Sequence, residues 1–180
     1  RQKLLGLESL APDAAADELE ELEAKHGERR TWIWAKLDQA PLAQALEHLA
    51  LLAQVARKPL GGESAEAMAS AYAAEGLQAD AAALAALALV KDHQDVKAVK
   101  AAVRAVYKPW LESGAERFQE LVREELPNRD APPKALAEVE PGTCILFADG
   151  LRLDLGKRLR QALEGAGLTV EEGWRWVPLP

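Results

Sequence analysis

The sequence has 180 residues and a formal net charge of −7, from 22 Lys and Arg against 29 Asp and Glu. Its 36 Ala and 29 Leu far outnumber its 15 β-branched residues, which excludes an all-β protein because strands favour β-branched and aromatic side chains. One Cys excludes a disulfide framework or a Cys-rich zinc module, and the acidic balance argues against broad electrostatic capture of nucleic acid.

Residues 1–126 show helical patterning almost throughout, and we predict that they form one helical domain. We expect a plain bundle rather than a repeat array, because the sequence has no clean internal period. Asp13 is a candidate N-cap, and Pro41 suits the first turn of a helix, where its missing N–H costs nothing. The main expected helices cover residues 13–26, 41–57, 64–75, 80–92, 95–107 and 110–126.

The pattern changes after a Pro-rich stretch, residues 127–142, which we interpret as a linker because proline stops the preceding helix. Residues 143–148 form a continuous apolar run of strand length. Residues 151–166 follow with a helical row of leucines, and short strands are predicted at 168–170 and 174–177. Residues 143–180 therefore predict a βαβ unit, so the expected fold is mainly α with a truncated α/β start.

The turn after the first predicted strand carries the residues most suited to chemistry. Asp149 would lie at the carboxyl end of a buried strand, where open α/β sheets bind ligands, and Gly150 allows a tight turn there. A carboxylate in that place suits a metal ion that clamps phosphate oxygens, and Arg152 could pair with a carboxylate or a phosphate. Asp154 would either support the metal-binding carboxylate without touching the metal, or place a favourable negative charge near the helix N-terminus. The ordinary alternative is an N-cap aspartate beside a surface arginine.

The string CILFADGLRLD, residues 144–154, resembles the opening strand and turn of the PglZ family, the alkaline-phosphatase-superfamily component of BREX phage-defence systems. The family hallmark is an apolar strand that runs into Asp-Gly-Leu-Arg-x-Asp. The sequence matches it at Asp149, Gly150, Leu151, Arg152 and Asp154. The resemblance is looser in the helical part, where it rests on the Trp-Ile-Trp-Ala stretch from Trp32 and on the helix after Pro41.

This resemblance implies a metal-dependent phosphohydrolase or nuclease-like parent, with Asp149 as a ligand of Zn, Mg or Mn. Arg152 and Asp154 would then lie on the phosphate side or support the ligand. The Thr or Ser nucleophile of the family would lie beyond Pro180, so we expect this chain alone to be inactive and to hold no metal. The implied partners are other BREX components, with nucleic acid contacted only through the full-length protein.

Two other interpretations remain open. The chain could be a non-enzymatic, repeat-like helical interaction module. We expect the Trp32/Trp34 and Trp174/Trp176 pairs to anchor the core or a domain contact, with a partner surface as the alternative. It could also be a response-regulator-like or Rossmann-like start, although it has no Gly-rich loop and no paired acidic cluster. Cys144 has no nearby His, which indicates a buried, inert thiol. No apolar run reaches the roughly 20 residues of a spanning helix, and we expect a cytoplasmic protein without membrane contact.

Overall fold

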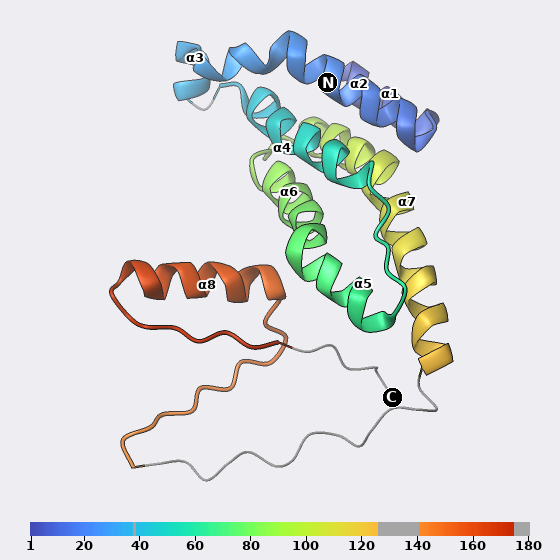
Figure 1. Cartoon of the computed structure of the whole chain (residues 1–180). Coiled ribbons are helices and arrows are strands. Elements are labelled where there is room, and N and C mark those ends of the chain that lie inside the picture. Colours follow the sequence, from blue (N-terminus) through green and yellow to red (C-terminus); the bar gives the residue numbers. More distant parts are fainter. Residues whose placement is uncertain (38, 126–140, 175–180) are drawn as a thin grey trace.

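A computed structural model of the chain describes residues 1–37, 39–125 and 141–174, and every regular element within them is helical (Figure 1). Most of the predicted linker, residues 127–142, lies outside the described residues. The elements are α1 (Gln2–Gly6), η1 (Leu7–Ser9), α2 (Pro12–His26), η2 (Gly27–Thr31), α3 (Ile33–Lys36), α4 (Pro41–Ala56), α5 (Ala65–Ala71), η3 (Tyr72–Gly76), α6 (Leu77–Ala88), α7 (His93–Glu125) and α8 (Leu153–Gly165).

Helix α4 forms the centre of the helical body, by which we mean residues 1–125. It packs against α2, α6 and α7, and Leu49, Leu52 and Ala53 on its inner face are fully buried. Figure 1 shows α4 between the N-terminal helices and the α6–α7 pair. Ala supplies much of the contact surface on α6 and α7, which permits close approach of the backbones with little loss of side-chain entropy.

The structure confirms α4 as predicted but corrects several other helix boundaries. The helices predicted at 64–75 and 80–92 are continuous through η3, and α6 ends at Ala88. Helix α2 begins at Pro12 with Ala11 as its N-cap, so Asp13 is not the cap. The two helices predicted at 95–107 and 110–126 are one helix, α7, which continues through Pro109. The interruption that proline favours is offset by packing, because Trp110 is only 8% exposed and its indole N–H donates to the Lys58 carbonyl over 2.9 Å.

The predicted βαβ start of an alkaline-phosphatase-like core is wrong, because the described residues contain no strand. Residues 143–148 and 168–170 have no regular secondary structure and form no strand pairing with other described residues, while residues 175–177 of the third predicted strand lie outside the described residues. A strand is stable only when neighbouring strands bond its backbone and its faces are covered, and α8 is a single helix. The described fold is all-α.

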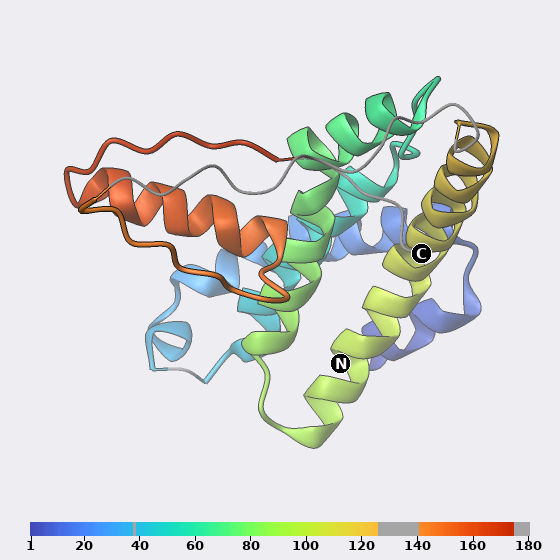
Figure 2. The same cartoon turned by 90° about the horizontal axis from the view of Figure 1, so that it is seen from below.

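Helix α8 lies to one side of the helical body in both cartoon views and packs on α6 (Figures 1 and 2). The predicted leucine row does not form its contact face, since Leu155 and Leu159 are 45% and 50% exposed. The contact face instead includes Asp154, which is 7% exposed, and Lys157. Among the described helices, none combines the length and the apolar character that crossing a membrane requires.

Candidate functional site

Two tyrosines share one carboxylate where α6 and α7 meet, and we call Tyr72, Asp80 and Tyr107 the tyrosine–aspartate cluster. The Tyr72 hydroxyl donates to Oδ2 of Asp80 over 2.5 Å, and the Tyr107 hydroxyl donates to Oδ1 over 2.6 Å. Both carboxylate oxygens therefore accept a short, charge-assisted hydrogen bond. The cluster joins η3, α6 and α7 through polar contacts that fix their relative rotation.

A π-helical turn, η3, places Tyr72 in this cluster. Its wider turn leaves carbonyls without the usual α-helical donor, and the Ala73 carbonyl accepts a hydrogen bond from the Lys157 ammonium of α8. Gly76 allows the turn to pack tightly, because an added Cβ would lie 2.9 Å from the Tyr72 ring and 3.0 Å from Leu60. The π-turn thus connects the helical body to α8.

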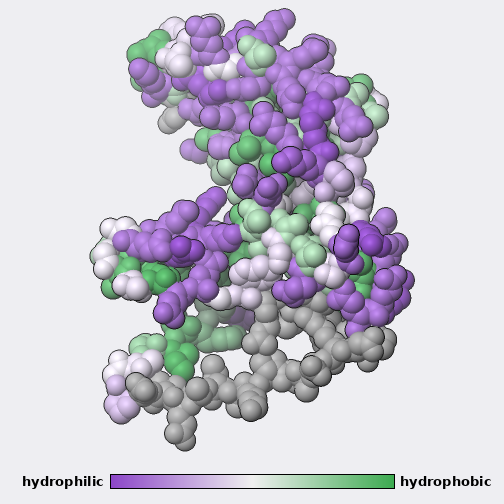
Figure 3. Space-filling model, in the orientation of Figure 1, coloured by the Kyte–Doolittle hydropathy of each residue, from purple (hydrophilic) through white to green (hydrophobic). Residues whose placement is uncertain are grey.

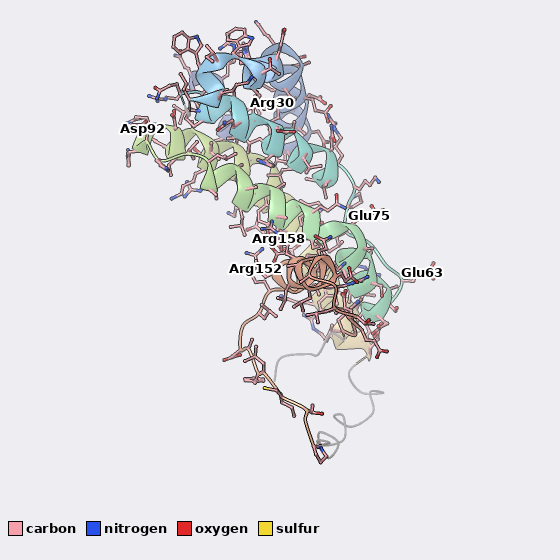
Figure 4. All side chains as sticks on the ribbon, turned by 90° about the vertical axis from the view of Figure 1, so that its left-hand side faces the viewer. Arg30, Glu63, Glu75, Asp92, Arg152 and Arg158 are labelled. Atoms are coloured by element: carbon pink, nitrogen blue, oxygen red, sulfur yellow. The ribbon has the colours of Figure 1, made fainter. Side chains whose placement is uncertain are left out.

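The sequence-predicted residues Arg152 and Asp154 lie next to the cluster and contact each other. The Arg152 Nε donates to Oδ1 of Asp154 over 3.0 Å, and the Asp154 side chain is buried. In Figure 4, Arg152 lies where the start of α8 meets the helical body. Its charge acts on Tyr72 and Tyr107, since it lowers the pKa of both phenols against the larger opposing effects. Asp154 is therefore buried against the body, while the Arg152 side chain stays 43% exposed.

The predicted metal ligand Asp149 is separate from this arrangement. It lies in an exposed turn in which Gly150 has a φ of 69°, a left-handed conformation that glycine adopts without strain. The N-cap of α8 is Arg152, so Asp149 is not the N-cap aspartate of the ordinary alternative. The described residues contain no group of three potential ligands that could hold a metal ion. Asp149 would need further ligands from outside them.

An apolar pocket of about 490 Å³ adjoins the cluster. The helical body forms one wall of the pocket. The C-terminal part, by which we mean residues 141–174, contributes Leu151, Leu153 and Trp174. The body contributes Leu60, Met68, Ala69, Tyr72, Trp110, Leu111, Gly114, Ala115 and Phe118. This lining offers few groups that could activate a substrate, and it suits apolar contact between the two parts of the chain.

Sequence reasoning missed Tyr72, Asp80, Tyr107 and Lys157. One signal was available, because Asp80 is the only charged residue in the otherwise Ala-rich and Leu-rich stretch 77–90. Its partners are 8 and 27 residues away, and the π-turn breaks the helical spacing that would relate them. The prediction that Cys144 is a buried thiol is wrong, since the structure places this residue in the exposed extended segment.

We expect the two phenols to resist ionisation. Partial burial raises the pKa of Tyr72 and of Tyr107, and the hydrogen bonds to Asp80 raise both further. They are the only tyrosines in the chain, so phenolate absorbance reports the cluster alone. Because the folded-state pKa values are raised, the stabilisation is complete below about pH 10, the unfolded value, and is lost as pH rises above it.

An absorbance titration of the folded chain should therefore show phenolate forming well above pH 10, whereas urea-unfolded chain should titrate near about pH 10. Helical signal followed in the same samples should fall together with phenolate formation. Titration of the folded chain near the ordinary tyrosine value would contradict the cluster.

The comparisons with known proteins give no family assignment, because no protein-family model, no curated protein and no solved structure matches the chain.

Proposed function

We propose that the helical body is a positioning domain of a PglZ-like phage-defence protein and that it holds the turn at residues 149–154. The observation that supports this proposal is the seating of Arg152 and Asp154 against the tyrosine–aspartate cluster. These two residues belong to the motif on which the resemblance rests. The body therefore contacts the same short segment that would contain the metal ligand.

The contacts leave the reactive end of the motif accessible. Asp154 is buried and Arg152 is paired with it, while Asp149 is exposed at the preceding turn. Lys157 adds a hydrogen bond to the π-turn one helical turn further on. A segment anchored at one end presents its free end in a restricted orientation, which is what a catalytic carboxylate requires.

In this proposal the complete protein is a cytoplasmic, metal-dependent phosphohydrolase or nuclease-like enzyme that works with other components of its defence system. Asp149 would hold a Zn, Mg or Mn ion together with ligands from outside the described residues. Such an ion would supply Lewis-acid stabilisation of phosphate oxygens. The described residues offer one carboxylate at this place, so we derive no metal-dependent step from them.

Substitution of Asp149 in a longer protein that contains this sequence tests the proposal. Asp149→Ala should lower hydrolysis of bis(p-nitrophenyl) phosphate in Zn, Mn or Mg by at least about 100-fold, because losing a direct ligand costs at least as much as losing its supporting partner. Glu171→Gln, which alters an exposed carboxylate in the same part of the chain, is the matched control. Equal activity of Asp149→Ala and the control would contradict the metal-ligand role.

A second candidate function, a non-enzymatic interaction module, is favoured by one observation. Trp32, Ile33, Trp34 and Leu37 at the α3 end of the body are 49–61% exposed. Arg29 lies 5.7 Å above the Trp32 ring, and Trp and Arg are the residues most enriched at binding hot spots. Binding of purified defence components to the isolated helical region, lost in Trp34→Ala, would support a module. Hydrolysis that depends on Asp149 would favour the enzyme.

A further inference from the structure

The two most exposed large apolar side chains of the described structure, Leu146 and Phe147, are neighbours in segment 143–148. Leu146 is 88% exposed, Phe147 is 84% exposed and Ile145 is 56% exposed. Figure 3 shows the resulting hydrophobic surface, in green, below α8. Large apolar side chains at such exposure are unfavourable in water. This segment therefore has a strong tendency to associate.

The backbone of the same segment is also available. Residues 144–147 form no backbone–backbone hydrogen bond with any other described residue, although their conformation is extended. Thr-Cys-Ile-Leu-Phe-Ala has no charge, no proline and no glycine, which is the composition of segments that pair with copies of themselves. Both the backbone N–H and C=O groups and the apolar side chains of this segment can thus pair with an added strand.

We propose that two copies of this chain associate by antiparallel pairing of residues 144–148 about a two-fold axis. Such an axis requires one residue to lie opposite its own counterpart, and the pairing would place Leu146 opposite Leu146 of the second copy and Ile145 opposite Phe147 of the second copy. Charge favours this direction, because Asp149 would then lie opposite the uncharged Thr143 of the second copy. Parallel pairing would put the two Asp149 carboxylates side by side, which is destabilising.

Helix α8 supplies the cover that a two-stranded ribbon needs. An isolated pair of strands is marginal in water and requires packing against a helix or further strands. Leu155 and Leu159 are about half exposed on the α8 face that does not contact the body. These leucines belong to the same C-terminal part of the chain, and they offer an apolar surface of the required kind. The inference is independent of the proposed function.

Sedimentation of the intact chain across a concentration series tests the proposal. We expect a reversible dimer that Leu146→Pro weakens by about tenfold or more, because proline removes a ladder donor. Leu168→Lys is the matched control, since Leu168 is 56% exposed outside the segment and its replacement should leave the dimer unchanged. Leu146 makes few contacts, so both variants should keep the helical signal of the body.

The single Cys gives an independent readout. In the proposed pair, Cys144 and Cys144 of the second copy are four positions apart along the strands, or about 14 Å at about 3.4 Å per residue. A bismaleimide whose spacer spans this distance should link them in the unsubstituted chain and not in Leu146→Pro. A chain that stays monomeric at all concentrations would overturn the proposal, and so would a dimer weakened equally by both substitutions. Open-ended oligomers instead of a dimer would overturn the two-fold pairing.

Discussion

Leu49→Ala is expected to lower the free energy of unfolding by about 3 kcal/mol, because it removes a large side chain from the centre of the core. Leu49 lies in the middle of α4, is fully buried and belongs to the core cluster that joins α2, α4, α6 and α7. Its truncation removes transfer free energy and leaves a cavity that Ala-rich neighbours have few atoms to fill. Urea unfolding followed by the helical signal gives the value.

Leu51→Ala provides the control on the same helix. Leu51 is two residues further along α4 and is 39% exposed, so its truncation should cost less than about 1 kcal/mol. The two variants then carry the same chemical change and differ only in how deeply the truncated leucine is buried. Similar losses for the two variants would show that α4 presents a different face to the core.

Asp80→Asn is expected to cost about 2 kcal/mol and to loosen the attachment of α8. The amide oxygen can accept from one tyrosine hydroxyl, but the amide NH₂ cannot accept from the other, which leaves a part-buried donor unsatisfied. The change also removes a second negative charge that acts on Arg152, whose direct partner is Asp154. Urea unfolding should report the loss of stability, and hydrogen exchange should become faster in the α8 amides.

A double-mutant cycle separates the cluster from general effects of the substitution. In a chain that already carries Tyr72→Phe and Tyr107→Phe, Asp80→Asn leaves no phenol donor without an acceptor and should cost much less. An equal cost in both backgrounds would mean that Asp80 stabilises the fold through other contacts. Unchanged exchange in α8 would mean that the cluster does not anchor the C-terminal part.

The core of the helical body could be predicted because its signal is local. Leu46, Leu49 and Ala53 recur at helical spacing on α4, and the structure buries all three. The continuity of α7 could not be predicted, since Pro109 favours a break and only the distant carbonyl of Lys58 shows why Trp110 keeps the helix intact. Local propensity was overridden there by tertiary packing.

The candidate site was predicted in part for a similar reason. Arg152 and Asp154 stand out because they are close in sequence, but their neighbours on the body come from three separate elements. An apolar run such as 143–148 indicates a strand only if other strands exist to bond it, and that condition is not local. The sequence therefore identified an apolar segment and could not tell whether anything covers it.

The π-turn at Tyr72–Gly76 makes the contact between the helical body and α8 depend on the number of residues in this part of the chain. A π-turn corresponds to one additional residue in an α-helix, and one residue rotates a helix by about 100°. In a regular α-helix the eight steps from Tyr72 to Asp80 would total about 800°, which would turn Tyr72 about 80° away from Asp80. Without Ala74 the seven steps of a regular α-helix would total about 700°, so the two side chains would still share a face, but the Ala73 carbonyl would regain an α-helical donor and Lys157 would lose its acceptor. The contact between the helical body and α8 is thus specified by the number of residues in this turn as much as by their identity.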